Sequence, residues 1–260
     1  MTRVGGDAPN WLTTYEEPDD SIVDMAEYRI LSRLKVVQSM SAEELKENFG
    51  EGSIIIAPGN VLVAAKKEPV LFVPVFFFTE FCVWGDRDDI AGPTIRDRSF
   101  DKAGDIARRC RDPERREEEY DDGKFKARYV EHLNFAGFIY GDHPQTMTAC
   151  VLSFSRGEFG TGRNFINAVT LRKVGGKTAP LWSQVWKLQT NFRDGGASKK
   201  WWGIDPTNPD DDTPSFISAE QVEFFKTEHV SCKEDFEKSK LLVDHGDDPE
   251  ANDDEDSFEG

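Results

Sequence analysis

The apolar run PVLFVPVFFFTEFCVW, residues 69–84, constrains the fold more than any other stretch of the sequence. It is rich in β-branched and aromatic residues, which favour strands. Its positions are apolar on both alternating faces, a pattern typical of a buried central strand or of a strand whose second face is covered by a ligand. The longest purely apolar part, 70–78, is too short to cross a bilayer as a helix and contains Pro74. The run therefore predicts a β core with this strand at its centre.

Other segments with strand character surround this run. They are 28–38, 53–56, 61–65, 127–141, 148–155, 180–192 and 199–204. Short helices are expected at 41–50 and after the Gly-rich stretch that begins at Gly157. A final helix is expected at 218–243, because Ser218 and Gln221 have the spacing of a capping box.

This pattern predicts a mainly β fold. We expect an OB-like five-stranded barrel, partly open, with long loop excursions, a C-terminal helix and a disordered acidic tail. The chain divides into an N-terminal arm (1–27), an OB-like nucleic-acid-binding domain (28–205), a linker with the C-terminal helix (206–243) and the acidic tail (244–260).

The densely charged stretch 85–127 is interpreted as a long excursion from the core. Its basic run RRCRDPERR (108–116) fits either contact with a polyanion or a solvated loop that the following EEEYDD neutralises. Both interpretations stay open.

Enzymatic signatures are weak. The motif GEFGTGRN resembles a phosphate-binding loop, but Arg163 and Asn164 stand where lysine and a hydroxyl residue are required. His229 and Cys232 have the spacing of half a metal site, yet no second ligand pair accompanies them. We therefore expect no enzyme activity, no metal and no cofactor.

Two features of the sequence bear on where the protein is located. The N-terminus lacks the basic-then-apolar pattern of a signal peptide. The four cysteines are widely scattered, which is typical of free thiols in a reducing compartment. We expect a soluble protein without membrane contact, in the cytoplasm of its host cell.

Charge is segregated along the chain. The net charge is −17, and the tail 244–260 contributes nine carboxylates and no base. Residues 151–200, in contrast, hold nine bases and only two acids, a balance of +7. A strongly basic segment inside an acidic chain favours binding of a polyanion.

Large aromatic residues alternate with these bases. Cations that follow phosphates and rings on which unpaired bases stack are the two requirements for binding single-stranded nucleic acid. The phosphate contacts are predicted from Arg156, Arg163, Arg172, Lys173, Lys187, Arg193, Lys199 and Lys200. The stacking candidates are Trp182, Trp186, Trp202, Phe159 and Trp84. Aromatic residues in strands usually pack in a core, so for each single ring core packing remains the alternative.

The tail suggests a second interaction. Tethered to a basic groove, its carboxylates compete with nucleic acid at high effective concentration. The residues expected to contact a partner protein are Asp253, Asp254, Glu255, Asp256 and Phe258. A tail that only improves solubility is the alternative, but it gives Phe258 no role.

An OB-type body followed by an acidic tail with a near-terminal aromatic residue resembles the single-stranded DNA-binding proteins of bacteriophages. The segments RLKVVQSMSAEE, VPVFFFTEFCVW, ACVLSFSRGEFGTGRNFINAV and PLWSQVWKLQT carry this resemblance. Unlike related tails, which often end on the aromatic residue, this chain continues with Glu259 and Gly260.

The resemblance implies a protein that coats single-stranded DNA in phage replication, recombination and repair. It also implies that the tail recruits replisome proteins such as a polymerase, helicase or primase. The alternative function is an acidic interaction protein, either a DNA mimic or a regulator of host RNA polymerase. The preference for DNA or RNA, the site size and the oligomeric state stay open.

Overall fold

The computed structural model describes residues 30–87, 90–120, 125–196 and 199–244. The predicted arm 1–27 and all of the acidic tail except Asp244 lie outside these ranges.

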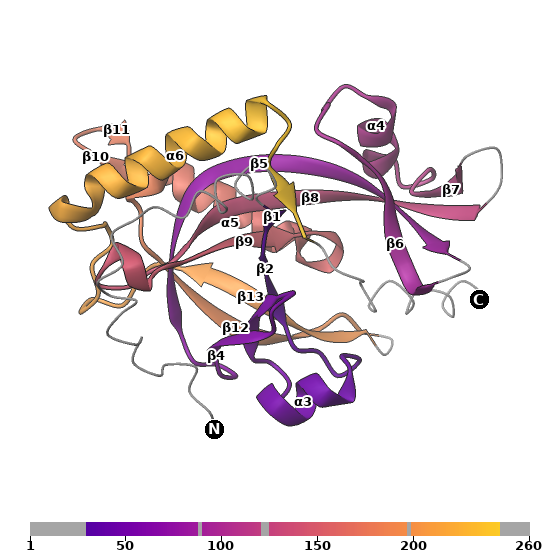
Figure 1. The fold of residues 1–260 in the computed structure, drawn as a ribbon, viewed down its shortest axis with the longest axis horizontal. Coiled ribbons are helices and arrows are strands. Elements are labelled where there is room, and N and C mark those ends of the chain that lie inside the picture. Colours follow the sequence, from indigo (N-terminus) through magenta and orange to yellow (C-terminus); the bar gives the residue numbers. More distant parts are fainter. Residues whose placement is uncertain (1–29, 88–89, 121–124, 197–198, 245–260) are drawn as a thin grey trace, which may run out of the picture.

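The main sheet has ten strands in the order β13-β12-β5-β8-β9-β2-β3-β4, with β6 paired to β5 and β7 to β8. Their bounds are β2 Arg33–Val36, β3 Ile54–Ala57, β4 Val61–Ala64, β5 Val70–Arg87, β6 Ile90–Ser99, β7 Glu117–Tyr120, β8 Phe125–Ile139, β9 Thr148–Phe154, β12 Trp186–Asp194 and β13 Lys200–Thr207. Most neighbouring pairs are antiparallel, and β2 with β9 is parallel. The sheet is therefore mixed, with the long strands β5 and β8 at its centre (Figure 1).

Two small pairs and eight helices complete the described part of the chain. The pairs are β1 (Ile30–Leu31) with β14 (Leu242–Val243) and β10 (Lys173–Val174) with β11 (Lys177–Thr178). The α-helices are α3 Glu43–Phe49, α4 Asp105–Arg111, α5 Phe159–Leu171 and α6 Val222–Glu237. The 3₁₀-helices are η1 Pro144–Thr146, η2 Arg156–Glu158, η3 Leu181–Ser183 and η4 Ala219–Gln221.

Several predictions are confirmed. The fold is mainly β, and the apolar run 69–84 lies almost entirely in the central strand β5. The C-terminal helix is present as η4 followed by α6, and Ser218 and Gln221 form the expected capping box.

The structure departs from the predicted partly open, five-stranded barrel in its number of strands, and its mixed sheet is not closed into a barrel. The sheet has ten strands and is open, and the stretch 85–127 contributes β6, α4 and β7 instead of only loops. The reason is the length of β5 and β8, whose far halves extend beyond the rest of the sheet. There β5 pairs with β6, and β8 pairs with β7.

The larger part of the sheet curls around one core. Side chains from both ends of the strand order, such as Ile54 and Ala64 at one end and Leu188 and Ile204 at the other, pack in the same cluster. Helix α5 adds Phe165 to this core, where its ring lies 4.6 Å from that of Phe135. We call the side of each strand that faces this cluster its inner face.

A side-chain amide bridges the gap that the curled sheet leaves. Gln38, just beyond β2, accepts a hydrogen bond from the backbone N–H of Trp202 in β13 and donates one to its carbonyl, both at 2.7 Å. The amide thus pairs with an edge strand as a neighbouring backbone would, although no ladder joins β13 to β2 in the described residues.

The opposite face of the sheet is covered by α6, which crosses above β5 in Figure 1. Phe225 and Cys232 of this helix pack with Val73 and Phe138 of the sheet in a second cluster. The C-terminal helix therefore belongs to the same packed body as the sheet.

A buried carboxylate lies where β5 leaves this cluster. Glu80 accepts hydrogen bonds from Arg98 Nη1 at 3.3 Å and from Asn134 Nδ2 at 3.2 Å. Burial raises its pKa, although His132, Arg98 and Asn134 act in the opposite direction. Arg98 also donates to the carbonyl of Val243 in β14, so the same guanidinium holds the C-terminal strand.

Candidate nucleic-acid interface

The hairpin of β12 and β13 carries six of the thirteen residues of the predicted site: Trp186, Lys187, Arg193, Lys199, Lys200 and Trp202. In this antiparallel pair Phe192 lies opposite Trp202, and Arg193 lies opposite Trp201. Because side chains alternate between the two faces of a strand, the first pair shares the inner face and the second pair the outer face. The two faces of the hairpin therefore differ in chemistry.

The inner face of the hairpin carries one accessible aromatic ring, that of Phe192. Trp202 is only 8% exposed, but its cross-strand partner Phe192 is 51% exposed and packs edge-on against it with ring centroids 5.2 Å apart. Lys66 places its ammonium group 4.4 Å from the centroid of the Trp202 ring. A half-exposed ring beside a cation is the combination that stacking on an unpaired base requires.

Three of the predicted stacking residues, Trp84, Trp186 and Trp202, are buried and belong to the core. Trp84 and Trp186 are 1% and 2% exposed, so neither presents a face on which a base can stack. Trp186 packs against Phe165 at 5.0 Å. Trp182 and Phe159 are half-buried and pack against the two large core clusters. For these rings the structure therefore agrees with the alternative interpretation, that they pack against the core.

Arg172 has a structural role. Its guanidinium lies 3.8 Å from the centroid of the Trp186 ring and donates hydrogen bonds to the carbonyls of Val185 and Ser215, both at 3.0 Å. Burial lowers its pKa. This arginine connects the end of α5 to the strands and does not extend into solvent as a phosphate contact requires.

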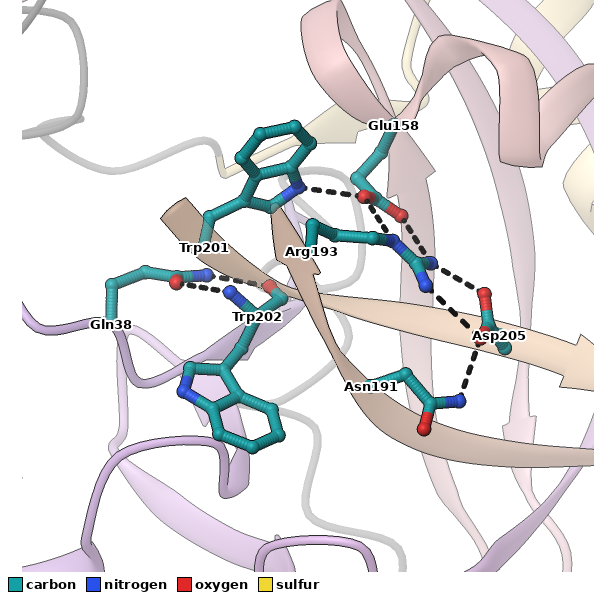
Figure 2. A network of polar contacts seen from close by, with 7 residues as sticks. All are labelled: Gln38, Glu158, Asn191, Arg193, Trp201, Trp202 and Asp205. Carbon is teal, nitrogen blue, oxygen red and sulfur yellow. Dashed lines mark hydrogen bonds and ion pairs between the residues drawn. The ribbon is translucent and has the colours of Figure 1, made fainter. Parts of the chain in front are cut away.

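Two further predicted cations are neutralised by acids. Lys187 forms an ion pair with Asp210 at 2.6 Å. Arg193 binds two carboxylates, those of Glu158 and Asp205, and the hydrogen bonds to both raise its pKa. Figure 2 shows its guanidinium between them, with Asn191 donating to Asp205 at 2.7 Å. The sequence could not indicate these pairs, because all three acids lie at least ten residues from their bases in the chain.

The remaining predicted cations are exposed, and they fall into two groups. Arg156, Lys199 and Lys200 adjoin Trp201, since the ring of Trp201 packs against Gly157 and Gly195. Arg163 lies on α5, and Lys173 follows the far end of this helix. A helix of 13 residues spans about 20 Å, so Lys173 is distant from the tip of the hairpin.

Three residues of the interface were missing from the predicted set. Phe192 and Trp201 lie within or just beyond the ring-rich segment, and period-two alternation would have placed Phe192 on the face of Trp202. Lys66 had no local signal, because the turn between β4 and β5 is brought to the hairpin by the long-range pairing of β5 with β12, in which Val70 lies opposite Leu188.

The other chemical motifs have structural explanations. The segment GEFGTGRN is helical, spanning η2 and the first turns of α5, so it is not a phosphate-binding loop. His229 Nδ1 lies 2.6 Å from the carbonyl oxygen of Val75, and all four cysteines are buried and form no disulfide. The described residues contain no group of three side chains that could hold a metal ion.

The family model described as Pam3 phage gp34-like protein matches residues 5–229. The chain belongs to the Pam3 phage gp34-like family. No curated protein and no solved structure matches it.

As a Pam3 phage gp34-like protein, the chain is a phage protein and acts in the host cell. None of its described helices is long and apolar enough to span a bilayer. The family match includes the β12–β13 hairpin, α5 and the first part of α6, so the whole candidate interface lies inside the region that defines the family.

Proposed function

We propose that this protein binds single-stranded DNA without enzymatic activity and protects it in the host cytoplasm during phage replication, recombination and repair. The observation that carries the proposal is the outer part of the β12–β13 hairpin, where the half-exposed ring of Phe192 packs against Trp202, the ammonium group of Lys66 lies over the Trp202 ring, and Lys199 and Lys200 are exposed. A base stacks on the ring, and Lys66, Lys199, Lys200 and Arg156 contact the phosphates.

The acidic tail has two roles in this proposal. Its nine carboxylates compete with DNA for the hairpin cations, which keeps the free protein from binding other polyanions. When DNA displaces the tail, Asp253, Asp254, Glu255, Asp256 and Phe258 become available to a replisome protein.

A titration of the full-length protein with oligo-dT, oligo-rU and duplex DNA of equal length tests the proposal. We expect binding to oligo-dT that weakens steeply with salt, because each phosphate contact adds about −0.7 to the slope of log K against log salt concentration. We also expect the single strand to bind more tightly than the duplex. Absence of binding to any single strand at low salt would refute the proposal.

One observation favours the alternative function. Three of the eight predicted phosphate contacts, Arg172, Lys187 and Arg193, are held by groups of the protein itself. The smaller basic surface and the net charge of −17 fit an acidic protein that occupies basic sites on other proteins. In that case the titration gives no complex with any nucleic acid, and a basic partner protein binds the body.

A further inference from the structure

The carboxylate of Glu158 lies in a site with the chemistry of an anion-binding site. Arg193 donates to it through Nε at 2.9 Å and Nη2 at 3.1 Å, and the indole Nε1 of Trp201 donates at 2.7 Å. Figure 2 shows the guanidinium and the indole pointing at the same carboxylate. We call these two donors, with the backbone of Gly203 beneath them, the Glu158 seat.

The backbone around the seat is shaped to admit the carboxylate. A Cβ atom at Gly203 would lie 2.4 Å from Glu158 Oε1, so only glycine leaves this space open. The ring of Trp201 lies against Gly157 and Gly195, where a Cβ atom on either would approach it to 3.0 Å. Three glycines thus bring the carboxylate and the indole together.

The donors of the seat match a phosphate group as well as a carboxylate. A guanidinium that donates two parallel hydrogen bonds recognises either anion. Asp205 also binds Arg193, so this arginine stays held in place when Glu158 leaves. The seat lies at the hairpin tip, beside the exposed Arg156.

The turn that carries Glu158 is strained. Arg156, two residues earlier, has φ of +47°, which side chains other than glycine rarely adopt. Strain of this kind is found where a segment is held by surrounding contacts. Departure of Glu158 from the seat releases the contact that holds η2 against the hairpin.

We propose that the Glu158 seat is a phosphate site, which Glu158 fills in the free protein and a backbone phosphate of a bound single strand fills in the complex. The inference rests on the proposed function and adds its regulation. Glu158 lowers the affinity for DNA, since only the fraction of molecules with an open seat is competent at this position. A polyanion with several other contacts displaces it, whereas a single small anion does not.

The test uses full-length protein and fluorescent oligo-dT. Glu158→Gln keeps the size of the side chain but offers the guanidinium a single neutral oxygen, so the seat opens and oligo-dT binds at least about fivefold more tightly. Asp205→Asn is the matched control, because it removes the same charge from Arg193 while leaving Glu158 in the seat. Its gain in affinity is expected to be clearly smaller. Thermal unfolding of both variants verifies that they are folded.

A second measurement follows the seat itself. The indole N–H resonance of Trp201, identified by its absence in Trp201→Phe, is expected to shift when oligo-dT binds to the otherwise unchanged protein. Equal gains for the two charge variants, weaker binding by folded Glu158→Gln, or an unmoved resonance in a DNA complex would overturn the seat and leave the proposed function standing. Absence of oligo-dT binding by the unchanged protein and by both variants would overturn both.

Discussion

At the scale of single residues, neighbouring positions of one hairpin have opposite roles. Phe192 and Arg193 are adjacent, yet the ring faces the accessible end of the inner face and the guanidinium is bound by two acids on the outer face. The alternation of strand side chains separates them. Stacking and charge therefore have to be tested by separate substitutions.

Phe192→Ala tests the stacking. We expect it to weaken binding to oligo-dT by about 1–3 kcal/mol, the usual contribution of one stacked base, with little effect on the salt slope. The control is Leu171→Ala, which removes an apolar side chain that is 72% exposed and lies at the other end of α5. Filter binding at two salt concentrations measures both variants, and equal losses would show that Phe192 has no specific role.

At the scale of elements, local sequence patterns predicted most of the fold. The apolar run 69–84 and the capping box at Ser218 identified β5 and the C-terminal helix, because both signals depend on nearby residues. The strands of 85–127 were missed, because their pairing partners are distant parts of β5 and β8. Propensity favours a loop in a charged segment, but tertiary pairing overrides it here.

For the candidate site, too, local signals were predicted correctly and long-range contacts were missed. The sequence located the basic and aromatic segment, yet it could not separate the buried Trp186 from the half-exposed Phe192, six residues further along β12. It also could not identify Glu158, Asp205 and Asp210 as the acids that neutralise nearby bases in space. Long-range contacts decide which of the cations remain available.

Two glycines provide a test of the packing between elements. In Gly137→Ala, the added Cβ on β8 would lie 2.3 Å from the carbonyl oxygen of Val73 on β5, so we expect a loss of unfolding free energy of about 3 kcal/mol or more. In Gly160→Ala, nothing lies within 4 Å of the added atom on α5, and the helix gains about 1 kcal/mol. Urea unfolding of both variants measures the opposite signs. A Gly137 variant as stable as the unchanged protein would contradict the close approach of β5 and β8.

At the scale of the whole molecule, stability is predicted to depend on pH through Glu80. Burial raises the pKa of this carboxyl group above its ordinary value of 4.5. A raised folded-state pKa adds stability below the unfolded-state pKa, and this stability is lost as the pH rises through the folded-state pKa. Relative to Glu80→Gln, the unchanged protein should therefore lose unfolding free energy from about pH 4.5 upward. Parallel pH profiles of the two proteins in urea unfolding would refute this.

Charge segregation leads to another prediction for the whole chain. Deleting residues 245–260 removes eight carboxylates and should tighten binding to oligo-dT while abolishing contact with replisome proteins. A matched variant with the same carboxylates changed to amides tests whether charge is responsible. Weaker DNA binding after the deletion would contradict competition by the tail.

The pairing of β1 with β14 has a mechanical consequence. Ile30 lies beside Leu242 and Leu31 beside Val243 in a parallel pair, so the first and last strands of the described chain meet. Tension applied between the two termini would load this pair in shear along its own axis. The hydrogen bond from Arg98 to the carbonyl of Val243 adds a side-chain contact that holds β14 at the same point. Under such tension the β1–β14 pair would bear the force first, and the main sheet would carry load only after this pair has separated.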